Sequence, residues 1–286
     1  PGALERSAGN DRDCDIRLML FAFHPTEAGW AVSEVNSDVP GGWAEASVLP
    51  RLAAHYFEGW EPRGHVGKAL LEAYRARIPK GGTIALVHAT SYADDRQVME
   101  FLSDYFAGYG FSTVFAGPDH LRWKNRRAVS LVEGWEGPVD GIVRFFPLEW
   151  LTGLPHKAGW EGYCDCETPS CNHPVAMLAQ AKRLPLVWDE LSLDLPVWHT
   201  LLPETRDPRA IKNPGTEWVL KPNLGRVGEG ISIKEAVPTK ELRQIERAAQ
   251  RHPKDWVAQR RFASRPLETE DGENFHLCVG AFTVQG

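Results

Sequence analysis

The segment GGTIALVHATSYADDRQVMEFLSDYFAGYG, residues 81–110, constrains the fold more than any other part of the chain. Its apolar run TIALVH is typical of a buried strand, and a loop and a helix closed by glycine follow. The strand-like FSTVFAG comes next, and VDGIVRFFP comes later. Because parallel strands need a crossover connection between them, this order predicts an α/β layer with parallel pairing. A ligand groove would then lie beyond the carboxyl ends of the strands.

The character of the sequence changes after residue 155. The stretch HKAGWEGYCDCETPSCNHP is polar and irregular, which indicates a linker or a domain boundary. VAMLAQAKRLPLVWDEL then predicts a helix. The strand EWVLKP, the strand GISIKEA, the helix TKELRQIERAAQ and the strands DWVAQRRFA and FHLCVGAFTVQ follow. This second half is expected to be an α+β unit with antiparallel strands, and we therefore expect two domains, at residues 1–165 and 166–286.

Composition excludes several classes of function. The chain has 286 residues and a net charge of −6, and it lacks a basic cluster, which argues against nucleic acid as a partner. No run approaches the roughly 18 apolar residues of a membrane span, and the start does not resemble a signal peptide. Five cysteines are few for this length and favour a reducing compartment, so we expect a cytoplasmic protein. Both ends, Pro1 and Gly286, suggest an internal portion of a longer protein.

Oxygen-bearing side chains recur near the N-terminus, where IRLMLFAFHPTEAGWAVSEVN predicts two strands joined by a turn. In the following SEVNSDVPGG, Glu34 and Asn36 would project from one face of the strand, and Asp38 shares their parity. Two oxygen ligands at a strand end suit Mg²⁺, which takes its remaining ligands from phosphate and water. The alternative is that these residues form turns that cap the strand.

A glycine-rich loop follows the strand that ends at Lys221, in WVLKPNLGRVGEGISIKE. Gly225, Gly228 and Gly230 would let backbone N–H groups approach phosphate oxygens, and the lysine would add a positive charge. The loop is not a P-loop, because it lacks the GxxxxGK(S/T) pattern, and it is not a dinucleotide fingerprint, because a strand and not a helix is expected after it. It indicates a flap over the phosphates of a nucleotide, and the alternative is a plain hairpin with a long glycine turn.

Two further polar residues are candidates for nucleotide binding. Gln259, in DWVAQRRFASRP, could pair with an adenine edge through its amide, or it could be an exposed edge-strand glutamine. Lys182 lies among apolar neighbours on an expected helix, where it could contact a nucleotide or extend its ammonium group into solvent.

The cysteines near the centre of the chain raise a separate possibility. Cys164, Cys166, Cys171 and His173 would be enough for a Cys₃His zinc site. Their spacing is irregular for such a site, so a loop with unpaired thiols is the interpretation that we favour.

Taken together, these stretches resemble the glutathionylspermidine synthetase family of ATP-grasp ligases, in its pre-ATP-grasp and nucleotide-binding portions. SEVNSDVPGGWAEAS matches the acid-x-Asn-x-Asp motif of that family, and NHPVAMLAQAKRLPLVWDEL matches its first lysine segment. EWVLKPNLGRVGEGI matches its KP-x-x-GR-x-G phosphate loop, and WVAQRRF matches its adenine-side glutamine. HATSYADDRQVMEFL and RFFPLEWL resemble connecting segments. The motifs occur in the family's order from about Arg17 onwards.

The resemblance implies a pre-ATP-grasp α/β layer followed by an incomplete ATP-grasp nucleotide-binding domain. It implies an enzyme that uses ATP and Mg²⁺ to phosphorylate a carboxylate, which an amine then attacks to give an amide. The carboxylate would be peptide-like and the amine could be a polyamine, with no nucleic acid or membrane as partner. The implied roles are nucleotide contact for Lys182 and Lys221, phosphate binding for Arg226 and the loop of Gly225, Gly228 and Gly230, adenine contact for Gln259, and magnesium binding for Glu34 and Asn36. Lys221 and Arg226 would also be catalytic.

The chain departs from the family pattern at Ala22. Asp-Phe-His is the family sequence there, whereas FAFH places alanine at the position of a metal ligand, for which Asp38 or a water could substitute. An end at Gly286 would leave out strands of the ATP-grasp domain, so we expect little or no ligase activity from this chain alone. The alternative to a ligase is a non-catalytic nucleotide-binding relative with a degraded metal site. A dehydrogenase is disfavoured because no glycine fingerprint follows TIALVHATSYADD.

Overall fold

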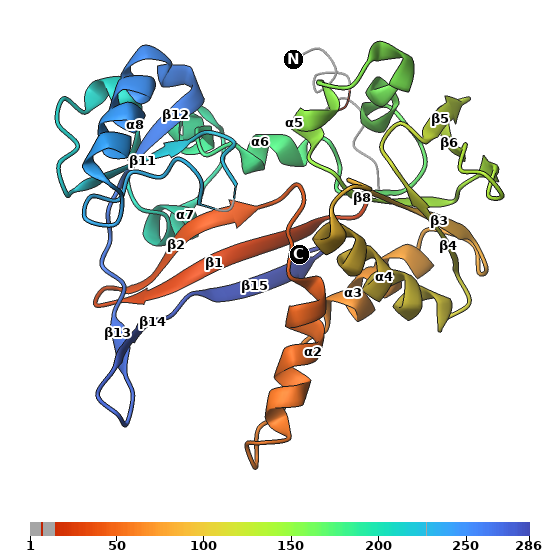
Figure 1. The fold of residues 1–286 in the computed structure, drawn as a ribbon, viewed down its shortest axis with the longest axis horizontal. Coiled ribbons are helices and arrows are strands. Elements are labelled where there is room, and N and C mark those ends of the chain that lie inside the picture. The colour runs from red at the N-terminus through yellow and green to blue at the C-terminus, as the bar shows by residue number, and fades with distance from the viewer. Residues whose placement is uncertain (1–6, 8–14, 227) are drawn as a thin grey trace. The chain divides into compact units, whose positions relative to one another are not determined.

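The computed structural model describes residues 7, 15–226 and 228–286, and Figure 1 shows its helices and strands. The contacts between residues divide the chain into two compact units. The first unit contains Pro1–Leu20, Asn36–Met177 and Phe282–Gly286, and the second contains Phe21–Val35 and Leu178–Ala281. The boundary expected at residues 165 and 166 falls inside the first unit, and residues 21–35 group with the later part of the chain.

A parallel sheet forms the centre of the first unit, as the strand–helix–strand pattern predicts. It contains β3 (Thr83–His88), β4 (Ser112–Ala116), β8 (Gly141–Phe145) and β9 (Ser170–Cys171), in the order β4-β3-β8-β9. Every pair in it is parallel. The central strands β3 and β8 are almost wholly buried, which explains why their sequences are mainly apolar. The expected α/β class is confirmed for this unit.

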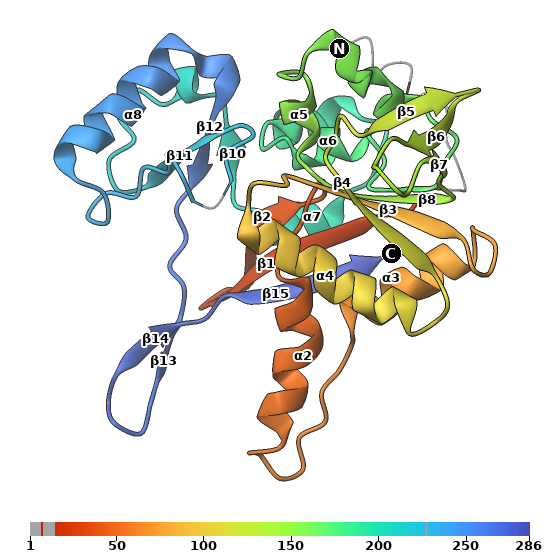
Figure 2. The ribbon, with the colours of Figure 1, turned by 45° about the vertical axis from the view of Figure 1, so that its right-hand side comes forward.

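Three helices contribute buried side chains to the hydrophobic core of this unit. They are α2 (Trp43–Ala54), α3 (Val66–Arg75) and α4 (Ala93–Ala107). The α4 helix packs on β3 and β4, and α3 packs on α2 and α4 (Figure 2). Leu70 and Tyr74 of α3, Met99 and Phe106 of α4 and Trp43 of α2 are all fully or almost fully buried in one cluster. The apolar residues at helical spacing therefore form the inner faces of these helices.

The remaining elements of the first unit are short. They are the antiparallel strands β5 (Leu121–Lys124), β6 (Arg127–Ser130) and β7 (Gly137–Pro138), the helix α5 (Leu148–Leu151) and the 3₁₀ helices η1 (His156–Ala158) and η2 (Trp160–Cys164). The stretch 156–174 is therefore not a linker, because it contains both 3₁₀ helices and continues into β9 of the parallel sheet.

The second unit is built on an antiparallel sheet with the order β10-β12-β11, which confirms the expected α+β class. Its strands are β10 (Thr205–Arg206), β11 (Trp218–Pro222) and β12 (Trp256–Arg260). The α8 helix (Thr239–Arg251) covers one face of the sheet, and its Ile245 and Ala249 are buried against Trp218, Leu220 and Ala258.

Several shorter elements lie between residues 176 and 276. They are α6 (Ala176–Gln180), η3 (Leu184–Glu190), α7 (Pro196–Leu201), η4 (Pro208–Ala210), η5 (Pro253–Asp255), β13 (Pro266–Glu268) and β14 (Asn274–His276). The strands β1 (Leu18–Thr26), β2 (Gly29–Asn36) and β15 (Val279–Val284) form a sheet in the order β15-β1-β2, and its residues are divided between the two units. None of the helices in the described ranges is long and apolar enough to cross a membrane.

Two predicted elements are wrong, and the single strand expected over FHLCVGAFTVQ is divided into β14 and β15, which belong to different sheets. The helix expected over VAMLAQAKRLPLVWDEL is broken into α6 and η3, and Pro185 lies in the first turn of the second piece. The strand expected over GISIKEA does not form. Ser232 donates its N–H to the carbonyl of Leu220 at 3.0 Å, but the N–H of Leu220 is bound by the hydroxyl of Ser232 at 2.7 Å. A side chain therefore replaces the backbone acceptor that a regular ladder would need.

An ion pair is buried in the first unit. The Arg144 guanidinium donates to Asp38 Oδ1 at 2.5 Å, and both side chains are almost fully inaccessible to solvent. The other oxygen of Asp38 accepts the backbone N–H of Leu148 at 3.0 Å. Two buried charges are tolerable only when they are paired and hydrogen-bonded, so neither residue is replaceable alone.

We predict that Asp38→Ala lowers the free energy of unfolding by about 3–5 kcal/mol, because it leaves the Arg144 guanidinium buried without its carboxylate. Glu100→Ala removes the exposed ion pair between Arg96 and Glu100 and should cost less than about 1 kcal/mol. Urea denaturation measures both values. Similar small losses in the two variants would contradict the structural role given to Asp38.

Candidate functional site

Lys221 is the second-last residue of β11, and its ammonium group is turned into the second unit. The residue is 9% exposed, and Nζ donates to Gln259 Oε1 at 2.6 Å and to the carbonyl of Ser33 at 3.0 Å. Leu220, the preceding residue, points to the opposite face of the sheet and packs under α8. The alternation of β11 therefore separates a hydrophobic face under α8 from a polar face that carries Lys221.

The surroundings of Lys221 disfavour the protonated, charged form of its side chain. Burial lowers its pKa to about 8 from 10.5, the nearby Lys182 ammonium group acts in the same direction, and the Glu34 carboxylate opposes both. Near pH 7 the side chain is still mostly protonated. A charged lysine that is largely removed from water is a strong binding group for phosphate oxygens, because no surrounding water screens it.

Lys182 lies in a turn between α6 and η3, and not on a helix as predicted. Its Nζ donates to Glu34 Oε1 at 3.0 Å and to the carbonyl of Gly225 at 2.8 Å. The side chain is only 14% exposed, so its ammonium group does not extend into solvent as the alternative interpretation required. Lys182 thereby joins β2 to the glycine loop within the second unit.

Asn223 holds this turn in place. Its carbonyl accepts the N–H of Lys182 at 3.0 Å, and its side-chain oxygen accepts the N–H of Arg183 at 3.0 Å. The Arg183 guanidinium in turn donates to Asp207 at 3.0 Å and to the carbonyls of Pro253 and Trp256. These contacts explain how a short irregular segment can place a lysine accurately.

The glycine loop starts directly after β11. Gly228 and Gly230 have φ values of 76° and 69°, which side chains rarely adopt, and a Cβ at Gly230 would lie 3.0 Å from the Pro222 ring. Glycine is therefore required at these two positions. Arg226, the expected phosphate and catalytic arginine, lies in the same loop as Gly225, and Val227 lies outside the described residues.

Gln259 is neither exposed nor on an edge strand. It is 7% exposed and lies on β12, the central strand of the sheet, directly opposite Val219 on one side and Thr205 on the other. Its Nε2 lies 3.4 Å from the Thr205 hydroxyl. Sequence reasoning missed Thr205, Asn223 and Ser33, because their roles depend on partners that are distant in the chain.

The two expected magnesium ligands, Glu34 and Asn36, have different surroundings. The Glu34 carboxylate faces Lys182, whereas the Asn36 amide is used in a turn, where Oδ1 accepts the N–H of Val39 at 3.2 Å and Nδ2 donates to its carbonyl at 3.3 Å. The turn-forming interpretation thus describes Asn36 in this structure. Asp38 does not substitute for the missing ligand at Ala22, because both of its carboxylate oxygens are engaged.

The central cysteines are placed inside the first unit. Cys164, Cys166 and Cys171 are buried, and burial raises the pKa of the Cys171 thiol to about 12. His173 lies 3.3 Å from an Asp15 oxygen. Within the part of the chain that the structure describes, no group of three or more His, Cys, Asp and Glu residues is arranged to hold a metal ion. The zinc hypothesis gains no support from this arrangement.

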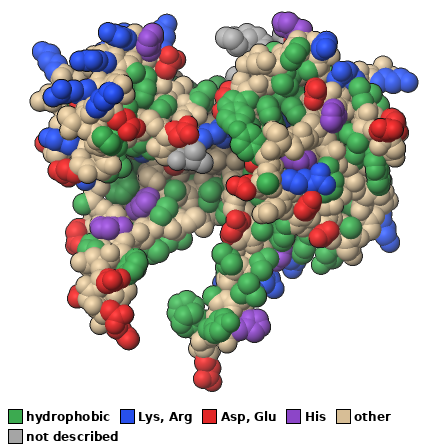
Figure 3. All heavy atoms as spheres, viewed as in Figure 1, with side chains coloured by type: hydrophobic (Ala, Val, Ile, Leu, Met, Phe, Trp, Pro, Cys, Tyr) green, Lys and Arg blue, Asp and Glu red, His purple; other side chains and the backbone are tan. Residues whose placement is uncertain are grey.

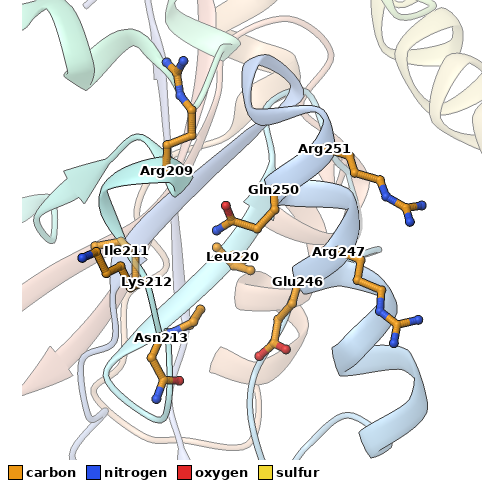
Figure 4. Close-up of a pocket in the computed structure, with 10 residues that line it drawn as sticks. Arg209, Ile211, Lys212, Asn213, Leu220, Glu246, Arg247, Gln250 and Arg251 are labelled. Carbon is orange, nitrogen blue, oxygen red and sulfur yellow. The ribbon is translucent and has the colours of Figure 1, made fainter.

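A separate pocket lies on the other face of the sheet in the second unit. It has a volume of about 560 Å³ and is lined by Leu220, by the segment 209–214 and by α8. Lys and Arg side chains gather over α8 (Figure 3). In Figure 4, however, the Arg247 and Arg251 side chains extend away from Lys212 and Asn213. The basic groups therefore do not converge, and this pocket is not part of the site around Lys221.

The lowered pKa of Lys221 predicts how the stability of the protein depends on pH. Between pH 8 and pH 10 the unfolded chain binds more protons at this lysine than the folded chain, so stability rises with pH. Relative to Lys221→Met, the free energy of unfolding of the wild type should rise by about 2 kcal/mol over this range. Denaturant unfolding at several pH values measures the difference. Parallel pH profiles for the two proteins would show that Lys221 titrates normally.

Comparison with known protein families identifies the family to which the chain belongs. The family model described as glutathionylspermidine synthase preATP-grasp matches residues 21–286. A search of curated proteins finds no match. The matched region includes both lysines, the glycine loop and the strand of Gln259, as well as the parallel sheet of the first unit. The chain therefore belongs to the glutathionylspermidine synthase pre-ATP-grasp family, and this membership indicates an ATP-grasp-type ligase.

Proposed function

We propose that this chain provides the nucleotide-binding part of an ATP- and Mg²⁺-dependent ligase, which joins a carboxylate to an amine through an acyl phosphate. The observation that carries the proposal is the meeting of Lys182, Lys221, Glu34 and Gly225 in the second unit. Two lysines, a carboxylate and a glycine loop form a set of groups that suits a metal–triphosphate.

The two lysines are proposed to bind the phosphates. In this structure each ammonium group is satisfied by oxygen atoms of the protein, at Glu34 and Gly225 for Lys182 and at Gln259 and Ser33 for Lys221. Phosphate oxygens have the same acceptor chemistry and more negative charge, so they could replace the two protein acceptors of Lys182 and the Ser33 carbonyl at Lys221. Phosphoryl transfer needs little from the protein beyond such positioning and charge stabilisation, and no side-chain nucleophile is required.

The residues of the glycine loop are proposed to cover the phosphates. Gly225, Gly228 and Gly230 leave the backbone free of side chains there, and Arg226 adds a second type of cation that can bind phosphate in a bidentate manner. Gln259 lies on the same side of the sheet as Lys221, and the family resemblance assigns it to the adenine edge.

Glu34 is the residue of this constellation that could hold Mg²⁺. One or two carboxylates plus phosphate oxygens and water are the usual ligands of Mg²⁺ in nucleotide sites, so a single glutamate is sufficient for a weak site. When bound, the metal would neutralise charge that develops on the phosphates. The substrates are proposed to be a small peptide-like carboxylic acid and an amine such as a polyamine.

Lys182→Met should lower the affinity for ATP, in the presence of Mg²⁺, by about tenfold or more, because it removes a charge-assisted contact to phosphate. Lys212→Met is the matched control, since Lys212 is an exposed lysine of the same unit that lines the separate pocket. It should leave the affinity within about twofold. Isothermal titration measures both. Equal effects of the two substitutions would refute the assignment of Lys182.

A second candidate function is a nucleotide-binding protein without catalysis. Ala22 favours it, together with the engagement of Asn36 and Asp38 in contacts of their own. The two candidates differ in how Mg²⁺ affects binding of ATP. A ligase should bind ATP more tightly with Mg²⁺, and Glu34→Gln should abolish this effect, whereas Ala22→Asp should strengthen it several-fold by adding a carboxylate. A wild-type affinity for ATP that is independent of Mg²⁺ would favour the non-catalytic candidate.

A further inference from the structure

We propose that Gln259 is a positioning residue for Lys221, and that it does not read the adenine base. The inference rests on the proposed nucleotide site and changes the role of one of its members. Its basis is the contact of 2.6 Å between Lys221 Nζ and Gln259 Oε1, which joins two buried side chains on neighbouring strands.

The register of the sheet explains why these side chains meet. Gln259 is directly opposite Val219, and Lys221 is two residues further along β11, so Lys221 lies on the same face as Val219. Lys221 is therefore the diagonal neighbour of Gln259, at a separation that long side chains can bridge. On its other side Gln259 is directly opposite Thr205 of β10. The three residues lie side by side across all three strands.

Chemistry fixes the orientation of the Gln259 amide. A lysine ammonium group can only donate hydrogen bonds, so the amide atom that faces Lys221 must be the oxygen. The amide nitrogen then faces the Thr205 hydroxyl, which can accept. To pair with an adenine edge, the amide would need its oxygen for the exocyclic amino group and its nitrogen for a ring nitrogen. Both atoms are already used within the sheet.

Transfer of the Gln259 amide from Lys221 to a base would be energetically unfavourable. Lys221 is buried, and among the described residues its hydrogen-bond acceptors are Gln259 and the Ser33 carbonyl. Release of Gln259 to a base would leave the buried ammonium group with one acceptor fewer, and an unsatisfied buried charge is costly. With Gln259 held in place, the ammonium group stays oriented for an incoming phosphate oxygen. Gln259 thereby affects phosphate binding and is indifferent to the base.

Inorganic tripolyphosphate separates the two roles, because it has the phosphates of ATP and no base. Gln259→Met keeps the length of the side chain and removes the acceptor. The affinities of the wild type, Gln259→Met, Lys221→Met and the double variant for ATP and for tripolyphosphate, both with Mg²⁺, are measured by isothermal titration. Gln259→Met should weaken both ligands by the same factor, on the order of tenfold, and should add nothing to Lys221→Met.

The other outcomes overturn the inference. If Gln259→Met weakens ATP while tripolyphosphate is unaffected, Gln259 reads the base. If neither affinity changes, the contact with Lys221 has no role in binding. Gln259→Leu is the second variant if Gln259→Met does not fold. Thr205→Val, which alters the other neighbour of Gln259, should have a smaller effect on both ligands, and a larger one would contradict the role given to Lys221. A wild type that binds neither ligand would refute the nucleotide site itself, and the inference with it.

Discussion

The buried ammonium group of Lys221 is the constraint on which the second unit depends. A charge that is largely removed from water must be held by acceptors, and the chain supplies two of them from distant segments, Ser33 on β2 and Gln259 on β12. Residues 21–35 consequently belong to the same compact unit as residues 178–281, although more than 140 residues separate them in the sequence. A site that needs both segments also explains why this unit is discontinuous along the chain.

The same principle organises the surroundings of Lys182. Its ammonium group joins Glu34 to the carbonyl of Gly225, and Asn223 fixes the turn that carries it. Both lysines thus occupy acceptor-rich positions that phosphate oxygens could take over. In the proposed site, phosphate oxygens would replace the acceptors at Glu34, Gly225 and Ser33, while Gln259 would keep Lys221 oriented, which limits the reorganisation that binding would need. Family membership indicates an ATP-grasp-type ligase, and the local chemistry is compatible with the nucleotide that we propose as the ligand of this unit.

Much of the fold could be predicted from the sequence, because it depends on local patterns. The strands β3, β4 and β8 of the parallel sheet, the helices α4 and α8 and the strands β11 and β12 all follow apolar patterns. The helix broken near Pro185 failed for a local reason, whereas other failures share a physical cause, which is a partner remote in sequence. Asp38 is committed to Arg144, and Ser232 replaces a backbone acceptor of Leu220. In the candidate site, the residue types at Lys182, Lys221, Glu34 and Gln259 were predictable, but their partners were not.

The central claim is that Lys182, Lys221 and the glycine loop bind the phosphates of one nucleotide. A crystal structure of the chain with Mg²⁺ and a non-hydrolysable ATP analogue tests this claim most directly. The account predicts phosphate oxygens within hydrogen-bond distance of both lysine Nζ atoms and of the loop that begins at Gly225, with the Glu34 carboxylate turned from Lys182 towards the metal. An analogue bound in the pocket between α8 and residues 209–214, with both lysines keeping their present partners, would contradict it.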